Sequence, residues 1–191
     1  MKKIFLVLIL FFGSINILNA EVNRIISGNK EAKITIIAYE SLTCSHCADF
    51  HKDIYPQLKK DYIDTGLVKI EFRHFPLDVA AFNASKISQC KIGKGLEILN
   101  SLYSNQQEWV IGKTVEEIND NLKKFIKNQG FEVNFEKCIN NKRIEDYVLN
   151  DRIEGTKKFK VNATPTIIIN DVKFDKTLNY KNLKKSLEKL I

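Results

Sequence analysis

The sequence lacks the features that mark several common classes of protein. It contains no uninterrupted run of about 20 apolar residues, which a bilayer-spanning helix needs, and no phosphate-binding loop or flavin fingerprint. It has three histidines and four cysteines, and no second close cysteine or histidine pair follows the one at residues 44–47. We therefore expect no cofactor and no resident metal, and we assign the single tryptophan, Trp109, to packing.

Basic residues are not gathered into a stripe. The chain has 30 lysines and arginines against 23 acidic residues, a formal net charge of +7, and the two signs are interspersed along its length. The densest basic run, residues 157–160 (KKFK), is short, whereas a nucleic-acid-binding surface combines a longer basic stripe with aromatic side chains. The charge pattern is typical of a solvated surface, and we expect no nucleic-acid partner.

The N-terminal residues have the pattern of a secretory signal peptide. Two lysines precede an apolar run at residues 4–12, and residues 18–20 (LNA) place small or apolar side chains before a cleavage point. We expect residues 1–20 to be removed, so that the mature chain begins at Glu21. The alternative is an uncleaved membrane anchor, but glycine, serine and asparagine interrupt the apolar run well before bilayer length.

Residues 21–77 are predicted to form a β-α-β unit. An isoleucine-rich strand at residues 33–40 (KITIIAYE) leads into a helix that starts at Ser45 and that Pro56 is expected to kink or divide. A second strand follows at residues 67–75, where apolar and polar side chains alternate. The cysteine pair therefore lies where a buried strand meets a helix.

Residues 156–191 are predicted to form a β-β-α unit. A strand at residues 166–170 (TIIIN) turns at Asp171 into a short partner strand, and Leu183, Leu187 and Leu190 have helical spacing. Between the two units, residues 78–155 carry helical spacing with few strand formers, a stretch too long to be a loop. We therefore expect an α/β fold with an inserted all-helical subdomain.

The motif Cys44-Ser45-His46-Cys47 is the candidate reactive centre. Two cysteines separated by two residues at a helix start can close a disulfide ring, and the helix dipole favours the thiolate of the first. Cys44 is therefore the expected nucleophile, and Cys47, one turn further on, is the expected resolving thiol.

The histidine inside the motif has a second expected role. His46 can stabilise the Cys44 thiolate by a hydrogen bond or, when protonated, by its charge, which would make the disulfide more oxidising. The alternative is that His46 is a solvated bystander. A further alternative for the motif is a zinc site that uses both thiolates with His46 or His51, but no downstream pair completes it.

Two other features are candidates for a role beside the motif: Glu40 and the Thr164-Pro165 bond. Glu40, four residues before Cys44, could relay the proton of Cys47 if it is half-buried at the strand end, although an exposed carboxylate fits the sequence equally. The Thr164-Pro165 bond stands at a strand entrance, where a cis peptide could present backbone to a ligand beside the dithiol.

Cys90 and Cys138 fall in different predicted helices. Because an exported chain meets an oxidising compartment, we expect them to form a structural disulfide rather than two separate buried thiols. The bridge would close a loop of about 48 residues and contribute roughly 4 kcal/mol in the chain-entropy model. It should take no part in catalysis.

Three segments together resemble the DsbA-like thiol:disulfide oxidoreductases of the alphaproteobacterial type: residues 39–51 (YESLTCSHCADFH), 72–78 (FRHFPLD) and 161–170 (VNATPTIIIN). The resemblance implies a periplasmic protein with a thioredoxin-like fold and a helical insertion. It also implies Cys44 as the attacking thiol, Cys47 as its partner, and a cis Pro165 preceded by Thr164. Unfolded exported proteins as substrates and a membrane partner that reoxidises the dithiol are implied as well.

The sequence departs from the best-known family members at Ser45, where they carry proline. The two residues between the cysteines tune the reduction potential, which spans about −270 to −120 mV in this superfamily. We expect a monomeric oxidase that donates its disulfide to exported proteins. The alternatives are a disulfide isomerase or reductase of the same fold, and a metal-binding or metal-delivering thiol module.

Overall fold

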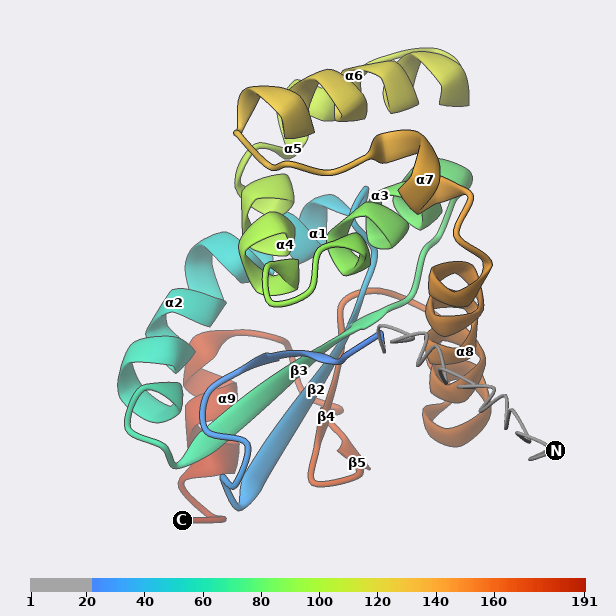
Figure 1. Ribbon diagram of the computed structural model, residues 1–191. Coiled ribbons are helices and arrows are strands. Elements are labelled where there is room, and N and C mark those ends of the chain that lie inside the picture. The colour runs from blue at the N-terminus through green and yellow to red at the C-terminus, as the bar shows by residue number, and fades with distance from the viewer. Residues whose placement is uncertain (1–21) are drawn as a thin grey trace, which may run out of the picture.

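The computed structural model describes residues 22–191, so the expected signal peptide at residues 1–20 lies outside the described residues. A five-stranded mixed sheet forms the centre of the molecule, with the strand order β1-β3-β2-β4-β5 (Figure 1). β2 and β3 pair in parallel, and the other three pairings are antiparallel. The strands are β1 (Ile25–Ser27), β2 (Ile34–Glu40), β3 (Val68–His74), β4 (Thr166–Ile169) and β5 (Val172–Lys173).

Helices make up most of the rest of the described chain, and two of the helical stretches are π-helical turns, η1 and η2. The first helical run is α1 (Ser45–Asp49), η1 (Phe50–Ile54), α2 (Tyr55–Leu58) and η2 (Lys59–Ile63). The inserted helices are α3 (Val79–Cys90), α4 (Gly95–Ser104), α5 (Gln106–Trp109), α6 (Val115–Asn128), α7 (Phe135–Ile139) and α8 (Lys142–Phe159). The last helix is α9 (Tyr180–Leu187). None of the helices within residues 22–191 is long and apolar enough to cross a membrane.

The two faces of the sheet carry separate apolar cores, because side chains alternate along each strand. On one face Ile36 of β2 packs in a cluster that includes the first helical run, α4 and Leu183 of α9. On the other face Tyr39 of β2 packs against Phe159 of α8. α8 approaches this face closely because it carries Gly155, where an added Cβ would lie 2.8 Å from the Tyr39 ring.

The helices α3 to α7 gather at one end of the sheet, and α8 returns along one of its faces (Figure 1). The helix α6 has a side-chain cap at its start and a glycine after its end. The Thr114 hydroxyl accepts the Glu117 N–H at its start, and Gly130 follows it with a φ of 73°. The predicted end of the insertion, residue 155, falls inside α8, which continues to Phe159.

The structure differs from the sequence-based expectations in two elements. β1 was not expected, since three residues are too few to display an alternating pattern. The closing helix ends at Leu187, so Leu190 lies beyond it and is exposed, whereas Leu183 and Leu187 are buried. The expected division near Pro56 is confirmed, because the π-helical turn η1 directly precedes the short helix that contains this proline.

A buried ion pair ties the segment before β1 to α8. The Asp151 carboxylate pairs with the Arg24 guanidinium and also accepts the backbone N–H of His74 at 3.2 Å. The Asp151 side chain is 2% exposed, and burial raises its pKa against the opposing effect of Arg24. This pair connects three parts of the chain that are far apart in sequence: the start of the described chain, the end of β3 and the inserted α8.

Candidate active site

The dithiol lies where β2 passes into α1. Cys44 is the N-cap residue of α1, with extended backbone angles, and its carbonyl accepts the N–H of Cys47 at 3.1 Å and that of Ala48 at 3.2 Å. Both cysteines of the motif are free thiols in the structure; Cys44 is half-buried and Cys47 is buried. The helix start thus leaves the sulfur of Cys44 accessible and places Cys47 inside.

The Cys44 thiol is strongly acidic. Its pKa is lowered to about 5, chiefly by a hydrogen bond from the Cys47 thiol and further by Thr164 and by the backbone N–H groups of Cys47 and His46, against the opposing effect of burial. The thiolate is therefore the dominant form of Cys44 at neutral pH. A stable thiolate is both a ready nucleophile and a good leaving group in disulfide exchange.

Cys47 has the opposite character. Burial raises its pKa, and hydrogen bonding to Cys44 and the charge of Glu40 raise it further. Cys47 therefore stays a thiol while Cys44 is a thiolate. The two sulfurs therefore differ in acidity; their roles as nucleophile and resolving thiol stay predictions.

The Thr164-Pro165 segment lies against the dithiol. The peptide bond between these two residues is cis, and the sulfur of Cys44 lies 3.4 Å from the carbonyl oxygen of Thr164. Cys44 and Thr164 are 120 positions apart in the sequence. The structure thus brings the loop before β4 next to the N-terminus of α1, where the backbone of the loop faces the reactive sulfur.

A buried polar cluster lies beneath Cys47. The Glu40 carboxylate is 3% exposed and is hydrogen-bonded to Nε2 of His51 at 2.8 Å, and the Tyr103 ring stacks on the His51 ring with centroids 4.1 Å apart. Burial raises the pKa of Tyr103, and the charges of Glu40 and Cys44 raise it further. The sequence allowed a half-buried or an exposed Glu40; the structure buries it more completely than either expectation. The partnership with His51 was not predicted, because the sequence suggested only a zinc ligand for that residue.

His46 contributes through its backbone. Its N–H helps to lower the pKa of Cys44, whereas its imidazole is 81% exposed and lies 3.6 Å from the Asp49 carboxylate. The expected side-chain contribution of His46 to the thiolate stays a prediction.

Side chains of the inserted helices hold the loop that carries Cys44. The Thr43 hydroxyl donates to Asp78, the N-cap residue of α3, at 2.6 Å. The side-chain amide of Gln106 in α5 donates to the carbonyls of Leu42 and Cys44. Sequence analysis missed both contacts, since nothing in a single sequence links residues that are 35 and 62 positions apart.

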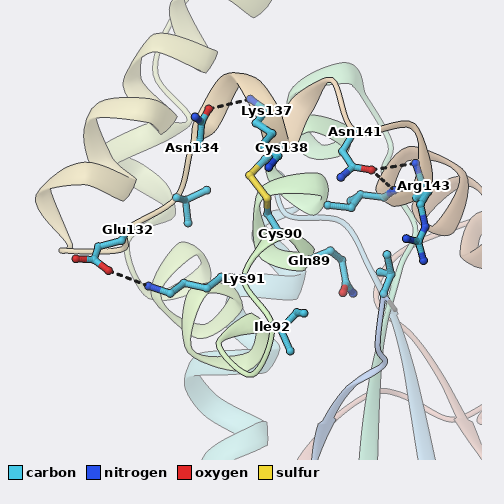
Figure 2. Close-up of a pocket in the computed structure, with 13 residues that line it drawn as sticks. Gln89, Cys90, Lys91, Ile92, Glu132, Asn134, Lys137, Cys138, Asn141 and Arg143 are labelled. Carbon is cyan, nitrogen blue, oxygen red and sulfur yellow. Dashed lines mark hydrogen bonds and ion pairs between the residues drawn. A yellow bond between two sulfur atoms is a disulfide. The ribbon is translucent and has the colours of Figure 1, made fainter. Parts of the chain in front are cut away.

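The second cysteine pair lies away from the dithiol. Cys90 at the end of α3 and Cys138 in α7 are joined by a disulfide, with their Cα atoms 5.6 Å apart (Figure 2). The bridge lines a surface pocket, where Lys91 pairs with Glu132 and the side chain of Asn141 caps α8. The disulfide therefore joins two inserted helices to each other. Within residues 22–191, no group of three or more His, Cys, Asp or Glu side chains is arranged to hold a metal ion.

Comparisons with known proteins agree with this geometry. A family model described as Thioredoxin matches residues 20–189. The crystal structure of alpha-DsbA1 from Wolbachia pipientis is 30% identical, with a TM-score of 0.78 and a match that covers 88% of this chain and 90% of that one. The expected thioredoxin-like fold with a helical insertion is thereby confirmed.

Two curated relatives are more distant. A Rickettsia prowazekii protein named as a protein-disulfide oxidoreductase is 27% identical over 88% of this chain and 62% of its own length. Disulfide bond formation protein D of Bacillus subtilis is 27% identical over 85% of this chain and 74% of its own length. The chain spans about three fifths of the length of the Rickettsia relatives that it matches. The chain belongs to the thioredoxin family and, within it, to the DsbA-like thiol:disulfide oxidoreductases.

Proposed function

We propose that this protein is a thiol:disulfide oxidoreductase that introduces disulfides into exported proteins through Cys44 and Cys47. The observation that carries the proposal is the asymmetry of the dithiol: the pKa of Cys44 is lowered to about 5, while burial raises that of Cys47. Stabilising the Cys44 thiolate stabilises the reduced form, and a protein whose reduced form is stabilised gives up its disulfide readily.

The reaction proceeds in two exchanges. A substrate thiolate attacks the sulfur of Cys44 in the oxidised protein, the Cys44–Cys47 bond breaks, and Cys47 leaves and takes up a proton. A second substrate thiolate then attacks the substrate sulfur of the mixed disulfide and releases Cys44 as a thiolate. Two electrons have passed from the substrate to the protein, which now holds a thiolate and a thiol.

Several side chains support these steps in the proposal. Glu40, buried beside Cys47 and hydrogen-bonded to His51, would exchange the proton of the Cys47 thiol with its surroundings. Thr164 and Pro165 would present backbone to the substrate segment beside Cys44, because the Thr164 carbonyl already lies 3.4 Å from that sulfur. The Cys90–Cys138 bridge would be structural.

The remaining assignments belong to the same proposal. The protein would act as a monomer in the periplasm, exported by residues 1–20. A membrane partner would reoxidise the dithiol after each cycle. Residues 21–77 and 156–191 would form the redox fold, and residues 78–155 the inserted subdomain. The family resemblance and the alpha-DsbA1 likeness support these assignments.

A transfer assay tests the proposed activity. Oxidised mature protein is mixed with a reduced, unfolded protein that contains two cysteines, and free thiols are counted on both partners. We expect two thiols to disappear from the substrate for each pair that appears on the enzyme. Cys44→Ala should abolish the transfer, and the double variant Cys90→Ala with Cys138→Ala should retain it. No transfer by the oxidised wild-type protein would contradict the proposal.

A further inference from the structure

Gln106 of the inserted helices makes two hydrogen bonds to the reactive loop. Its side-chain amide nitrogen donates to the carbonyl of Leu42 at 2.8 Å and to that of Cys44 at 3.1 Å. One amide group thus satisfies two backbone acceptors on either side of Thr43. Leu42 is 1% exposed, so its carbonyl gains a partner in a place where leaving it unpaired would be costly.

Gln106 is itself held in place. It begins α5, a helix of four residues that ends at Trp109. The Trp109 side chain is fully buried, and its indole N–H donates to the Leu102 carbonyl of α4 at 2.9 Å. The side chain of Asn105 donates to the Ser101 carbonyl in the same helix. The Gln106 amide is therefore presented to the loop by a turn that is anchored in the inserted helices.

The orientation of the Cys44 peptide matters for the reactive sulfur. The Cys44 carbonyl accepts the N–H groups of Cys47 and Ala48 as the N-cap of α1, and no side-chain cap strengthens this helix start. In the same conformation the backbone N–H groups of Cys47 and His46 help to lower the pKa of the Cys44 thiol. Holding the Cys44 carbonyl therefore also holds the first turn of α1, to which these N–H groups belong.

We propose that Gln106 is a positioning residue for thiol-disulfide exchange, because it fixes the peptide of Cys44 so that the backbone N–H groups of α1 stabilise the thiolate. The inference rests on the proposed function of the dithiol, but it concerns the thiolate itself. In this proposal the inserted helices, through Gln106, are part of the redox centre. Asp78 also holds the loop, through the Thr43 hydroxyl, so that side chains at α3 and α5 both bind it.

The test is a thiolate titration of the reduced protein by ultraviolet absorbance, which needs no substrate. Gln106→Met keeps the size of the side chain and removes the two donors. We expect the midpoint of the Cys44 titration to rise by about half a pH unit, close to a threefold loss of acidity, the size expected when a hydrogen bond of ordinary strength is lost. The neighbouring Gln107→Met, an exposed position, is the matched control and should leave the midpoint unchanged.

Two further measurements separate positioning from a purely structural role. The disulfide of Gln106→Met should become about threefold harder to reduce in glutathione buffers at neutral pH, in line with the shifted midpoint. The free energy of unfolding of the oxidised form is measured alongside, and Gln106→Ala serves as a second variant. If Gln106→Met and Gln106→Ala both lost stability but kept the wild-type midpoint of the Cys44 titration, the proposal would be overturned. An unchanged midpoint would do so even if the transfer assay succeeded, and a raised midpoint would support it even if that assay failed.

Discussion

The acidity of Cys44 depends first on its neighbour, and removing that neighbour gives a defined prediction. The largest contribution to the lowered pKa of Cys44 is the hydrogen bond from the Cys47 thiol. In Cys47→Ala this donor is lost, while the backbone N–H groups of α1 and the contact with Thr164 remain. We therefore expect the pKa of Cys44 to rise and to stay below that of an ordinary cysteine.

The size of the rise follows from the strength of the bond. A hydrogen bond to a charged group contributes about 1.5–3 kcal/mol, and one pH unit corresponds to about 1.4 kcal/mol. Because Cys44 is half-buried and solvent partly replaces the lost donor, the lower end applies. The midpoint should move from about 5 up by about one pH unit.

The measurement is a pH titration of the thiolate absorbance, with the rate of alkylation of Cys44 as a second readout. Cys47→Ser is the matched control, because its hydroxyl keeps a donor at the same position and should hold the midpoint near that of the wild type. If Cys47→Ala also titrated near pH 5, the assignment of the Cys47 thiol as the main stabilising group would be refuted.

Three further predictions concern stability. Replacing Cys90 and Cys138 by alanine together should lower the free energy of unfolding by about 4 kcal/mol in the chain-entropy model, measured by urea denaturation, because the bridge closes 48 residues; an equally stable variant would contradict this. Asp151→Asn should cost about 2 kcal/mol, since it breaks a buried ion pair whose arginine is partly exposed, while Asp146→Asn at an exposed position of the same helix should cost little in the same experiment. The folded pKa of Cys44 is about 5 against an ordinary value of 9.0, so the reduced form should gain stability relative to the oxidised form as pH rises from about 5 to about 9, and lose it as pH falls through 5. Urea unfolding of the reduced and oxidised forms, at about pH 4 and about pH 8, checks the sign of this change. A difference in stability between the two forms that does not change with pH would contradict the prediction.

Local patterns predicted the parts of the fold that carry the chemistry. The isoleucine run of β2, the alternation in β3 and the helical spacing after Ser45 placed the dithiol at a strand-to-helix junction, and the structure has it there. These elements are fixed by side chains that are close in sequence. The turn after β4 is also local, since Asn170 and Asp171 both adopt the positive φ that a tight hairpin requires.

Several contacts between distant segments were not predicted from the sequence. The hydrogen bond between Gln106 and the Cys44 carbonyl spans 62 residues, and the pair of Arg24 and Asp151 spans 127. Glu40 is buried with His51 of η1, on which Tyr103 of α4 stacks, and no local pattern specifies this arrangement. Pairing of Cys90 with Cys138 was predictable only because an exported chain with four cysteines leaves few partners.

The reduction potential of the Cys44–Cys47 pair tests the central claim most directly. The mature protein is equilibrated in glutathione buffers, the reactive pair is quantified by alkylation, and Cys90 and Cys138 are scored separately by mapping the modified positions. An oxidase that stabilises its Cys44 thiolate should have a potential near about −120 mV. A value near about −270 mV, that of a reductant, would contradict the proposed function.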